Sequence, residues 1–342
     1  MLKPGINEQV AEIIEKALSY RPIEPGEALT LLKRVQVNSL EMGLLCAAAD
    51  RVTRQRFRNM GEVFSQVGLN YAHCSLECSF CSFGVAVKSD SDLSREEAVA
   101  RVRYFADEGA NAVGLMATAD YPFERFLKIG RAARAELPAD YPLAANIADF
   151  EPTDARALLD AGFTAVYHVI RLREGTDTPL SPDKRRRTLL AARAVGLDVT
   201  YCVEPIGPEH TPEELVDGIF RAKEFEPTSM ATMRRVVVPG TRLAERGQIT
   251  EVEQAKIQAV TTLACISWPS LMMMGAHEPS MLFLRAEANR MTAETGVNPR
   301  DPLRETSRGR GRTVADCARM IGDAGFTLRK GPSPALQGPL RK

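Results

Sequence analysis

Three cysteines stand close together in the stretch NYAHCSLECSFCSFG, residues 70 to 84, as Cys74, Cys78 and Cys81. Three thiolates on a short loop can hold three irons of a cubane 4Fe–4S cluster and leave the fourth iron open to another ligand. A structural zinc site normally has four ligands, and here only His73, next to Cys74, could complete such a set. A third interpretation is three buried free thiols without a metal. The spacing favours the open cluster.

The other cysteines give no sign of a disulfide framework. Cys46, Cys202, Cys265 and Cys317 stand alone, and the total of seven is odd. Regularly spaced, even-numbered cysteines are typical of secreted scaffolds, so this pattern predicts a reducing compartment. We therefore expect the clustered thiols to serve a metal and the isolated ones to be small core or pocket residues.

Charge and hydropathy exclude several classes of partner. The chain has 44 basic and 44 acidic residues, and this balance predicts neither a nucleic-acid nor an anionic-membrane partner. No apolar run reaches the length of about 18–20 residues that a membrane span needs. The first turns after Met1 carry polar residues throughout, unlike a secretory signal. These features predict a cytoplasmic protein.

The elements that must position the cysteines form a regular alternation. Helical patterns fill the chain up to residue 65, and then short apolar runs alternate with amphipathic helices in about eight strand–helix units. Ser94 followed by Glu97 predicts a capping box, and Gly109, Gly162 and Gly196 predict the glycine that ends a helix before a strand.

Such repetition predicts an α/β fold, a closed (β/α)8 barrel of the TIM type, with an open doubly wound sheet as the alternative. We expect an N-terminal helical extension over 1–65, the barrel with a C-terminal helix over 66–328, and a loose tail over 329–342. The cysteine loop follows the first strand, at the mouth where active sites of this fold lie.

The motif Cys-x3-Cys-x2-Cys, with Phe80 just before the third cysteine, resembles the signature of the radical S-adenosylmethionine (SAM) superfamily. The helical lead-in, the complete barrel and the helix at TVADCARMIGDAGF are similar to the biotin-synthase-like branch, which includes biotin synthase, methylornithine synthase and the iron–iron hydrogenase maturase. The resemblance implies one 4Fe–4S cluster on Cys74, Cys78 and Cys81. It also implies SAM on the open iron, cleaved to a 5′-deoxyadenosyl radical that abstracts hydrogen from a substrate.

The resemblance also suggests SAM contacts. The stretch CVEPIGPEHT is similar to the glycine motif of the family's fifth strand, and VIRLREG ends the expected fourth strand, where an Arg can pair with a carboxylate and a Glu with an ammonium group. A solvated strand end is the other interpretation of VIRLREG. The implied cofactor-binding residues are Phe80, Asn146, Arg171, Arg173, Glu174, Ile206, Gly207 and Glu209.

Other polar residues are expected to face the substrate at the mouth. The family's second-strand glycine-glycine-glutamate element is replaced by GLMATAD, where Thr118 and Asp120 are the polar residues. His277 and Glu278 follow the apolar seventh strand. The full set of candidate substrate contacts is Thr118, Asp120, Tyr167, His168, His277 and Glu278. They predict a small polar substrate, in cofactor or amino-acid-derived metabolite biosynthesis.

Two other functions remain open at this point. Sulfur insertion of the biotin or lipoyl synthase type needs a second cluster, and only Cys202 stands where biotin synthase has such a ligand, so a partner protein would have to supply that cluster. A non-catalytic iron–sulfur carrier would bind no SAM. An enzyme would need a reductant such as ferredoxin or flavodoxin.

Overall fold

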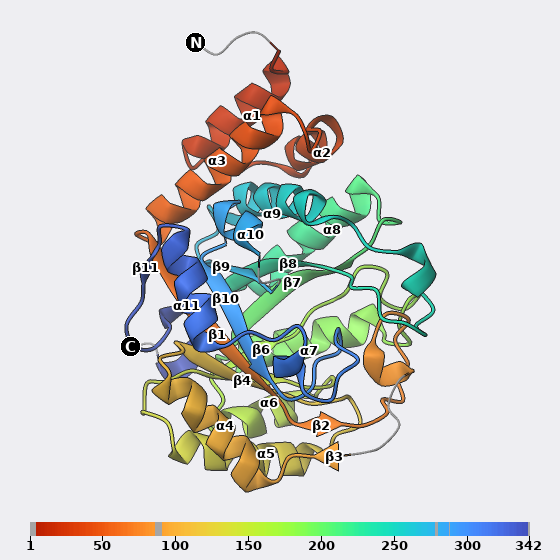
Figure 1. Ribbon diagram of the computed structural model, residues 1–342, viewed down its shortest axis with the longest axis vertical. Helices are drawn as coiled ribbons and strands as arrows, with labels where there is room; N and C mark the ends of the chain where they lie inside the picture. Colours follow the sequence, from red (N-terminus) through yellow and green to blue (C-terminus); the bar gives the residue numbers. More distant parts are fainter. Residues whose placement is uncertain (1–4, 86–90, 278–279, 287, 341–342) are drawn as a thin grey trace.

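A closed barrel of eight parallel strands forms the centre of the molecule (Figure 1). The computed structural model describes residues 5–85, 91–277, 280–286 and 288–340. The sheet runs in the order β10-β9-β8-β7-β6-β5-β4-β1, and β1 closes it by pairing with β10. The barrel strands are β1 (Met60–Gly68), β4 (Ala112–Met116), β5 (Leu143–Asn146), β6 (Ala165–Tyr167), β7 (Asp198–Ile206), β8 (Ser229–Arg234), β9 (Met273–Ala276) and β10 (Arg290–Thr295). The predicted (β/α)8 barrel is confirmed, and the closure excludes the open sheet.

Helices surround the barrel, joined to the strands by short loops. Ser94 and Glu97 form the predicted capping box, and Gly109, Gly162 and Gly196 all have φ between 87° and 90°, a conformation that glycine adopts without strain. The helices after β1 are α4 (Arg95–Asp107), α5 (Phe123–Ala135), α6 (Pro152–Asp160), α7 (Pro182–Ala194), α8 (Pro212–Arg221), α9 (Glu251–Cys265), α10 (Met281–Arg285) and α11 (Val314–Asp323).

Three helices precede the barrel and lie together at one end of the molecule (Figure 1). They are α1 (Glu8–Leu18), α2 (Pro25–Arg34) and α3 (Leu40–Arg56). α1 packs against the other two, α2 packs against α8 and α9, and α3 packs against α9. β1 begins at Met60, six residues before residue 66, because the strand extends below the barrel, where Met60 and Gly61 pair with β11 (Thr327–Leu328).

The segment over 329–340 differs from the loose tail that the sequence predicts. Two short 3-10 helices, η5 (Pro334–Leu336) and η6 (Gly338–Leu340), lie under the barrel, and Ala335 and Leu336 are fully buried against barrel-floor residues. The hydroxyl of Thr164 donates to the Leu336 carbonyl at 2.6 Å. Small residues at the lower ends of the strands leave an opening that these apolar side chains fill, so the floor is closed.

The opposite end of the barrel carries the cysteine loop. After β1 the chain makes β2 (Asn70–Tyr71), which pairs antiparallel with β3 (Ser91–Asp92), and the loop between them contains η1 (Ser82–Gly84). Other short 3-10 turns are η2 (Ala222–Phe225), η3 (Ala244–Arg246) and η4 (Thr306–Arg308). Within the described ranges, no helix combines the length and the apolar character that crossing a bilayer requires.

Candidate active site

Cys74, Cys78 and Cys81 lie on the loop between β2 and η1 and line one cavity of about 170 Å³ inside the barrel mouth. Backbone hydrogen bonds fix the shape of the loop. The Cys81 N–H donates to the Cys78 carbonyl at 3.0 Å, and the Cys74 N–H donates to the Phe83 carbonyl at 3.0 Å. The loop thus directs its three thiols into a common space.

The spacing of these thiols is wider than a zinc site needs. Ligands of a tetrahedral zinc with Zn–S bonds of about 2.3 Å lie roughly 3.8 Å apart. Among the described residues, the three Sγ atoms do not all fall within 4.8 Å of one another. His73 pairs with Glu77 at 3.3 Å on the outer side of the loop, and its side chain is 52% exposed. A donor set of three separated thiols without a fourth side chain fits a multi-iron cluster better than a single tetrahedral ion.

Arg171 is one of the arginines that line the cavity. Its Nε lies 3.3 Å from Glu204 Oε1, and its Nη1 lies 3.9 Å from Glu174 Oε2. Burial disfavours the charged guanidinium, but the two carboxylates outweigh it and raise the pKa of Arg171. Phe80 lies beside it, with the guanidinium carbon 6.0 Å from the ring centre. Tyr167 donates to the other oxygen of Glu204 at 2.5 Å, so these side chains form one charged wall of the cavity.

A second group of ion pairs adjoins this wall, and two of its members, Asp149 and Arg185, also line the cavity. Arg185 is 3.1 Å from Asp149 and 3.3 Å from Glu174, and His168 Nε2 is 2.9 Å from Asp149. Burial and the nearby Arg185 lower the pKa of His168 to about 4, so His168 is neutral at pH 7. Burial raises the pKa of Asp149, but the hydrogen bond from His168 and the charge of Arg185 outweigh it and lower it to about 2. The sequence analysis did not single out Asp149, Arg185 or Glu204.

The remaining candidates divide between the cavity and its surroundings. Thr118, Asn146, Tyr167, Arg171 and His277 line the cavity, whereas Glu174 and His168 lie behind it. Thr118 is bonded to Asn70 through both its N–H and its hydroxyl, at 2.9 and 2.8 Å. Asp120 lies under the cysteine loop rather than among the cavity-lining residues. Glu278 falls outside the described residues.

The candidates after β7 do not line the cavity. Ile206 is buried in the core, and Arg173 pairs with Glu214 at 2.7 Å on the outer side. Gly207 has no room for a side chain, since an added Cβ would lie 2.4 Å from Arg235 Nη1. Glu209 pairs with the same Arg235.

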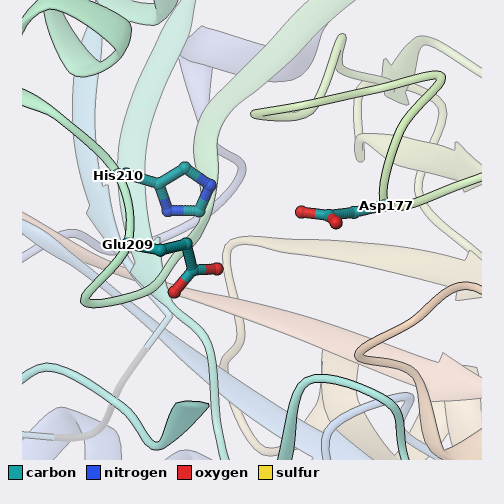
Figure 2. A group of neighbouring side chains, drawn as sticks. All are labelled: Asp177, Glu209 and His210. Carbon is teal, nitrogen blue, oxygen red and sulfur yellow. The ribbon is translucent and has the colours of Figure 1, made fainter.

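Asp177, Glu209 and His210 face one another beside these residues (Figure 2). Their potential ligand atoms all lie within 4.8 Å of one another. However, Glu209 is already neutralised by Arg235, and His210 Nδ1 accepts the Gly207 N–H at 2.9 Å. Glu209 and His210 therefore help to hold the loop after β7 in place.

A buried glutamate that sequence reasoning missed lies near the mouth. Glu294 Oε1 accepts from Gln66 at 3.1 Å and from Asn298 at 2.8 Å, and it lies 3.0 Å from His277 Nε2. Burial raises the pKa of Glu294 to about 7, although Arg300 and Arg310 act in the opposite direction. Burial also lowers the pKa of His277 well below its usual value, so His277 is neutral near pH 7, where Glu294 is about half protonated.

This raised pKa predicts a pH-dependent stability. The pKa of Glu294 is 4.5 in the unfolded chain and about 7 in the folded protein, so the folded state binds the proton more tightly. The stability that this proton contributes is therefore lost as the pH rises from 4.5 through 7. Glu294→Gln keeps the shared acceptor oxygen and removes the titration. Between pH 4.5 and 7.5, we expect the free energy of unfolding to fall by about 2 kcal/mol more in the parent than in the variant. Urea unfolding across that pH range measures this difference. Parallel plots of the free energy of unfolding against pH for the two proteins would contradict the prediction.

Comparisons with known proteins agree with this architecture. No protein-family model matches the chain. The biotin synthase of Kocuria rhizophila is 29% identical over 339 residues, which cover 95% of this chain and 70% of that protein. Methylornithine synthase superposes with a TM-score of 0.78 at 18% identity, covering 94% of this chain and 98% of the other. The FeFe-hydrogenase maturase of Carboxydothermus hydrogenoformans gives 0.75 at 20% identity, with coverages of 94% and 80%.

The closed barrel with a cysteine loop at its mouth, together with the sequence similarity to biotin synthases, indicates a radical SAM enzyme. Within that class, the chain is similar in sequence to biotin synthases over nearly its whole length, whereas the structural likenesses by themselves show only the fold. The chain is thus similar to the biotin-synthase-like radical SAM enzymes in both sequence and fold.

Proposed function

We propose that the chain is a single-cluster radical SAM enzyme that acts on a small polar substrate inside its barrel. The observation that carries the proposal is that Cys74, Cys78 and Cys81 open into the same cavity as Arg171 and the inner face of the barrel. When bound, a 4Fe–4S cluster on these thiols supplies the electron that cleaves SAM to a 5′-deoxyadenosyl radical, which abstracts a hydrogen atom from the substrate.

The residues of the chain have separable tasks in this proposal. Arg171 offers its planar guanidinium to the carboxylate of SAM, and Glu204, ion-paired with it, is placed to accept the ammonium group. Asp149 and Arg185, which are paired with each other and also line the cavity, help to hold this charged wall in place. Apolar side chains such as Phe64 and Met116 line the rest of the cavity and exclude water, which protects a reactive carbon radical.

The test is anaerobic. The protein is reconstituted with iron and sulfide, reduced chemically or with ferredoxin or flavodoxin, and given SAM, and 5′-deoxyadenosine is measured against unreconstituted protein. Cluster-dependent deoxyadenosine is the expected result. Assembly of a four-iron cluster that neither binds nor cleaves SAM would overturn the proposal and leave an iron–sulfur carrier.

Asp120 is expected to control how firmly the cluster is held. Its carboxylate accepts from the Ser75 N–H at 2.6 Å and from the Ser75 hydroxyl at 2.5 Å, next to Cys74. Asp120→Ala removes both acceptors, and groups that support metal ligands typically account for about 10- to 100-fold in affinity. We expect a chelator to release iron about tenfold faster from the variant, followed by loss of cluster absorbance. Glu77→Gln, which removes only the exposed pair with His73, is the matched control.

Sulfur insertion with a partner protein is the second candidate, favoured by the biotin synthase relatives. Cys202 lies between Thr200 and Glu204 on β7, and the two-residue period of a strand puts it on the same inward face as these cavity-lining residues. β4 and β5 carry no cysteine, so the chain offers one thiol for a second cluster. This candidate predicts deoxyadenosine formation by the isolated chain but sulfur transfer only when a cluster-carrying partner is added.

A further inference from the structure

The loop after β10, residues 296–312, gathers positive charge on one part of a chain whose net charge is zero. We call this segment the arginine loop, because it contains five arginines and only two acidic residues. The five are Arg300, Arg304, Arg308, Arg310 and Arg312. A local excess of one sign attracts a partner of the opposite charge, so the arginine loop is a candidate interaction surface.

The two acidic residues of the arginine loop serve its own folding. Asp301 is 2% exposed, and its carboxylate accepts the backbone N–H of Arg310 at 2.9 Å. Glu305 accepts the Gly296 N–H at 2.6 Å and pairs with Arg101 of α4 at 2.9 Å. These carboxylates shape the loop and attach it to α4, and neither forms an ion pair with an exposed arginine of the loop.

Three of the five arginines, Arg304, Arg308 and Arg312, are exposed. No ion pair joins any of them to a carboxylate among the residues that the structure describes. Glu97 on α4 is the nearby acidic group, and its pKa is lowered mainly by hydrogen bonds with Ser94 and to a smaller extent by the charge of Arg304. Three positive charges therefore stand against one negative charge on this surface.

The exposed arginines border a groove of about 440 Å³ beside the cysteine loop. Arg304 and Arg308 line one side of the groove, and β2 and β3 line the other. Asp92 of β3 is already paired with Arg125, so it does not neutralise these arginines. Leu303, which is 44% exposed, adds apolar surface to the same groove. Apolar surface with a basic rim suits the docking of an acidic protein.

The arginine loop also contacts the cysteine loop directly. The Ser82 N–H, next to Cys81, donates to the Pro299 carbonyl at 2.9 Å, and the Ser82 hydroxyl donates to the Asn298 carbonyl at 3.3 Å. Asn298, Pro299 and Arg300 line the same cavity as the three clustered cysteines. Because electron transfer through protein slows steeply with distance, a redox protein docked here would be well placed to reduce a cluster on these thiols.

We propose that the arginine loop is the docking surface for an acidic electron-transfer protein. The partner is oxidised by one electron, and that electron is the one that cleavage of the sulfonium C–S bond of SAM consumes. That the partner delivers an electron rests on the proposed function, whereas the docking surface itself rests on the charges and the groove. A nucleic acid is the less favoured occupant, since the chain as a whole has no excess of positive charge.

The binding test uses reconstituted protein and a flavodoxin as the acidic probe, immobilised on a biosensor that reports the association rate. A double variant combines Arg304→Gln and Arg308→Gln. At an ionic strength of about 10 mM, where charges act over roughly 30 Å, this variant should associate about tenfold more slowly than the parent. At about 1 M, where that range falls to roughly 3 Å, the two proteins should associate at the same rate.

A matched control combines Arg156→Gln and Arg187→Gln, which remove two exposed arginines from α6 and α7 and change the total charge by the same amount. The control should associate like the parent. Equal slowing of both double variants would show that only net charge matters, and unchanged association in the arginine-loop variant would place the partner elsewhere. Either result would overturn the proposal, as would an arginine loop that binds a short RNA and no flavodoxin.

A second readout separates docking from chemistry. With limiting flavodoxin as reductant at low ionic strength, deoxyadenosine formation by the arginine-loop variant should fall about tenfold. With dithionite, a small reductant that needs no docking surface, it should stay unchanged, because neither Arg304 nor Arg308 lines the cavity of the cysteines. A loss with both reductants would show that these arginines support the active site, and the docking surface would be refuted.

The two proposals can fail separately. A parent protein that associates with flavodoxin through Arg304 and Arg308 but forms no deoxyadenosine with either reductant would retain the docking surface and refute the proposed enzyme. A parent that forms deoxyadenosine with dithionite but associates with flavodoxin independently of these arginines, or not at all, would do the reverse.

Discussion

Cys78→Ala is expected to abolish formation of 5′-deoxyadenosine, whereas Cys202→Ala leaves it unchanged. Cys78 is one of three thiols that face the cavity, and two remaining thiols cannot hold a four-iron cluster in a defined position. Removing a group that acts as a unit with the others should lower the rate by at least about a hundredfold. Iron and sulfide content, together with deoxyadenosine yield, measures both effects.

Cys202 is a demanding control because it is also a cysteine of the barrel interior. It is 1% exposed and belongs to the hydrophobic core, so alanine removes one small buried group, at a cost of about 1 kcal/mol in stability. A large loss of deoxyadenosine in Cys202→Ala would show that a second cluster takes part in SAM cleavage. Retained deoxyadenosine with lost sulfur transfer would instead support the sulfur-insertion function.

The barrel and the cysteine loop could be predicted because their signals are local in the sequence. The capping box at Ser94 and the glycines before the strands act within a few residues, and each is present in the structure. The thiols of Cys74, Cys78 and Cys81 are likewise close in the chain, so their spacing alone brings them together. Regular repetition of such units leaves few possible topologies.

The charged wall could not be predicted in the same way, because its members meet only after folding. Asp149, Arg185 and Glu204 come from three different strand–helix units and have no common motif. In the sequence, Glu294 is one polar residue of a strand among others. Its pKa is raised because the side chain is buried, and this burial cannot be seen in the sequence.

Two neighbouring arginines show most directly what the sequence alone cannot predict about the site. Arg171 and Arg173 are two positions apart in VIRLREG, and the sequence assigns both to SAM. In the structure Arg173 has φ of 53°, in the left-handed region, and this turn sends its side chain outward to Glu214 while Arg171 stays in the cavity. One residue with an unusual backbone angle thus separates two residues that look equivalent in the sequence.

This separation makes a matched pair of variants informative. Arg171→Met should weaken SAM binding about tenfold or more, since it removes the guanidinium that faces the cavity. It should also reduce the free energy of unfolding by about 3 kcal/mol, because Glu204 loses its cationic partner in a buried site and Glu174 keeps only Arg185. Arg173→Met removes a pair at the surface, and we expect a change in stability of about 1 kcal/mol or less.

Equilibrium dialysis with labelled SAM measures the affinity for SAM, and urea unfolding independently measures the free energy of unfolding. Arg171→Lys keeps the charge but loses the planar fork, so it should restore more of the stability than of the SAM binding. If Arg173→Met weakened SAM binding as much as Arg171→Met, both arginines would contact SAM as the sequence suggests, and the loop after β6 would have to rearrange when SAM binds. If neither variant weakened it, the carboxylate of SAM would be held elsewhere in the cavity, and the pair of Arg171 with Glu204 would be a structural element of the barrel mouth.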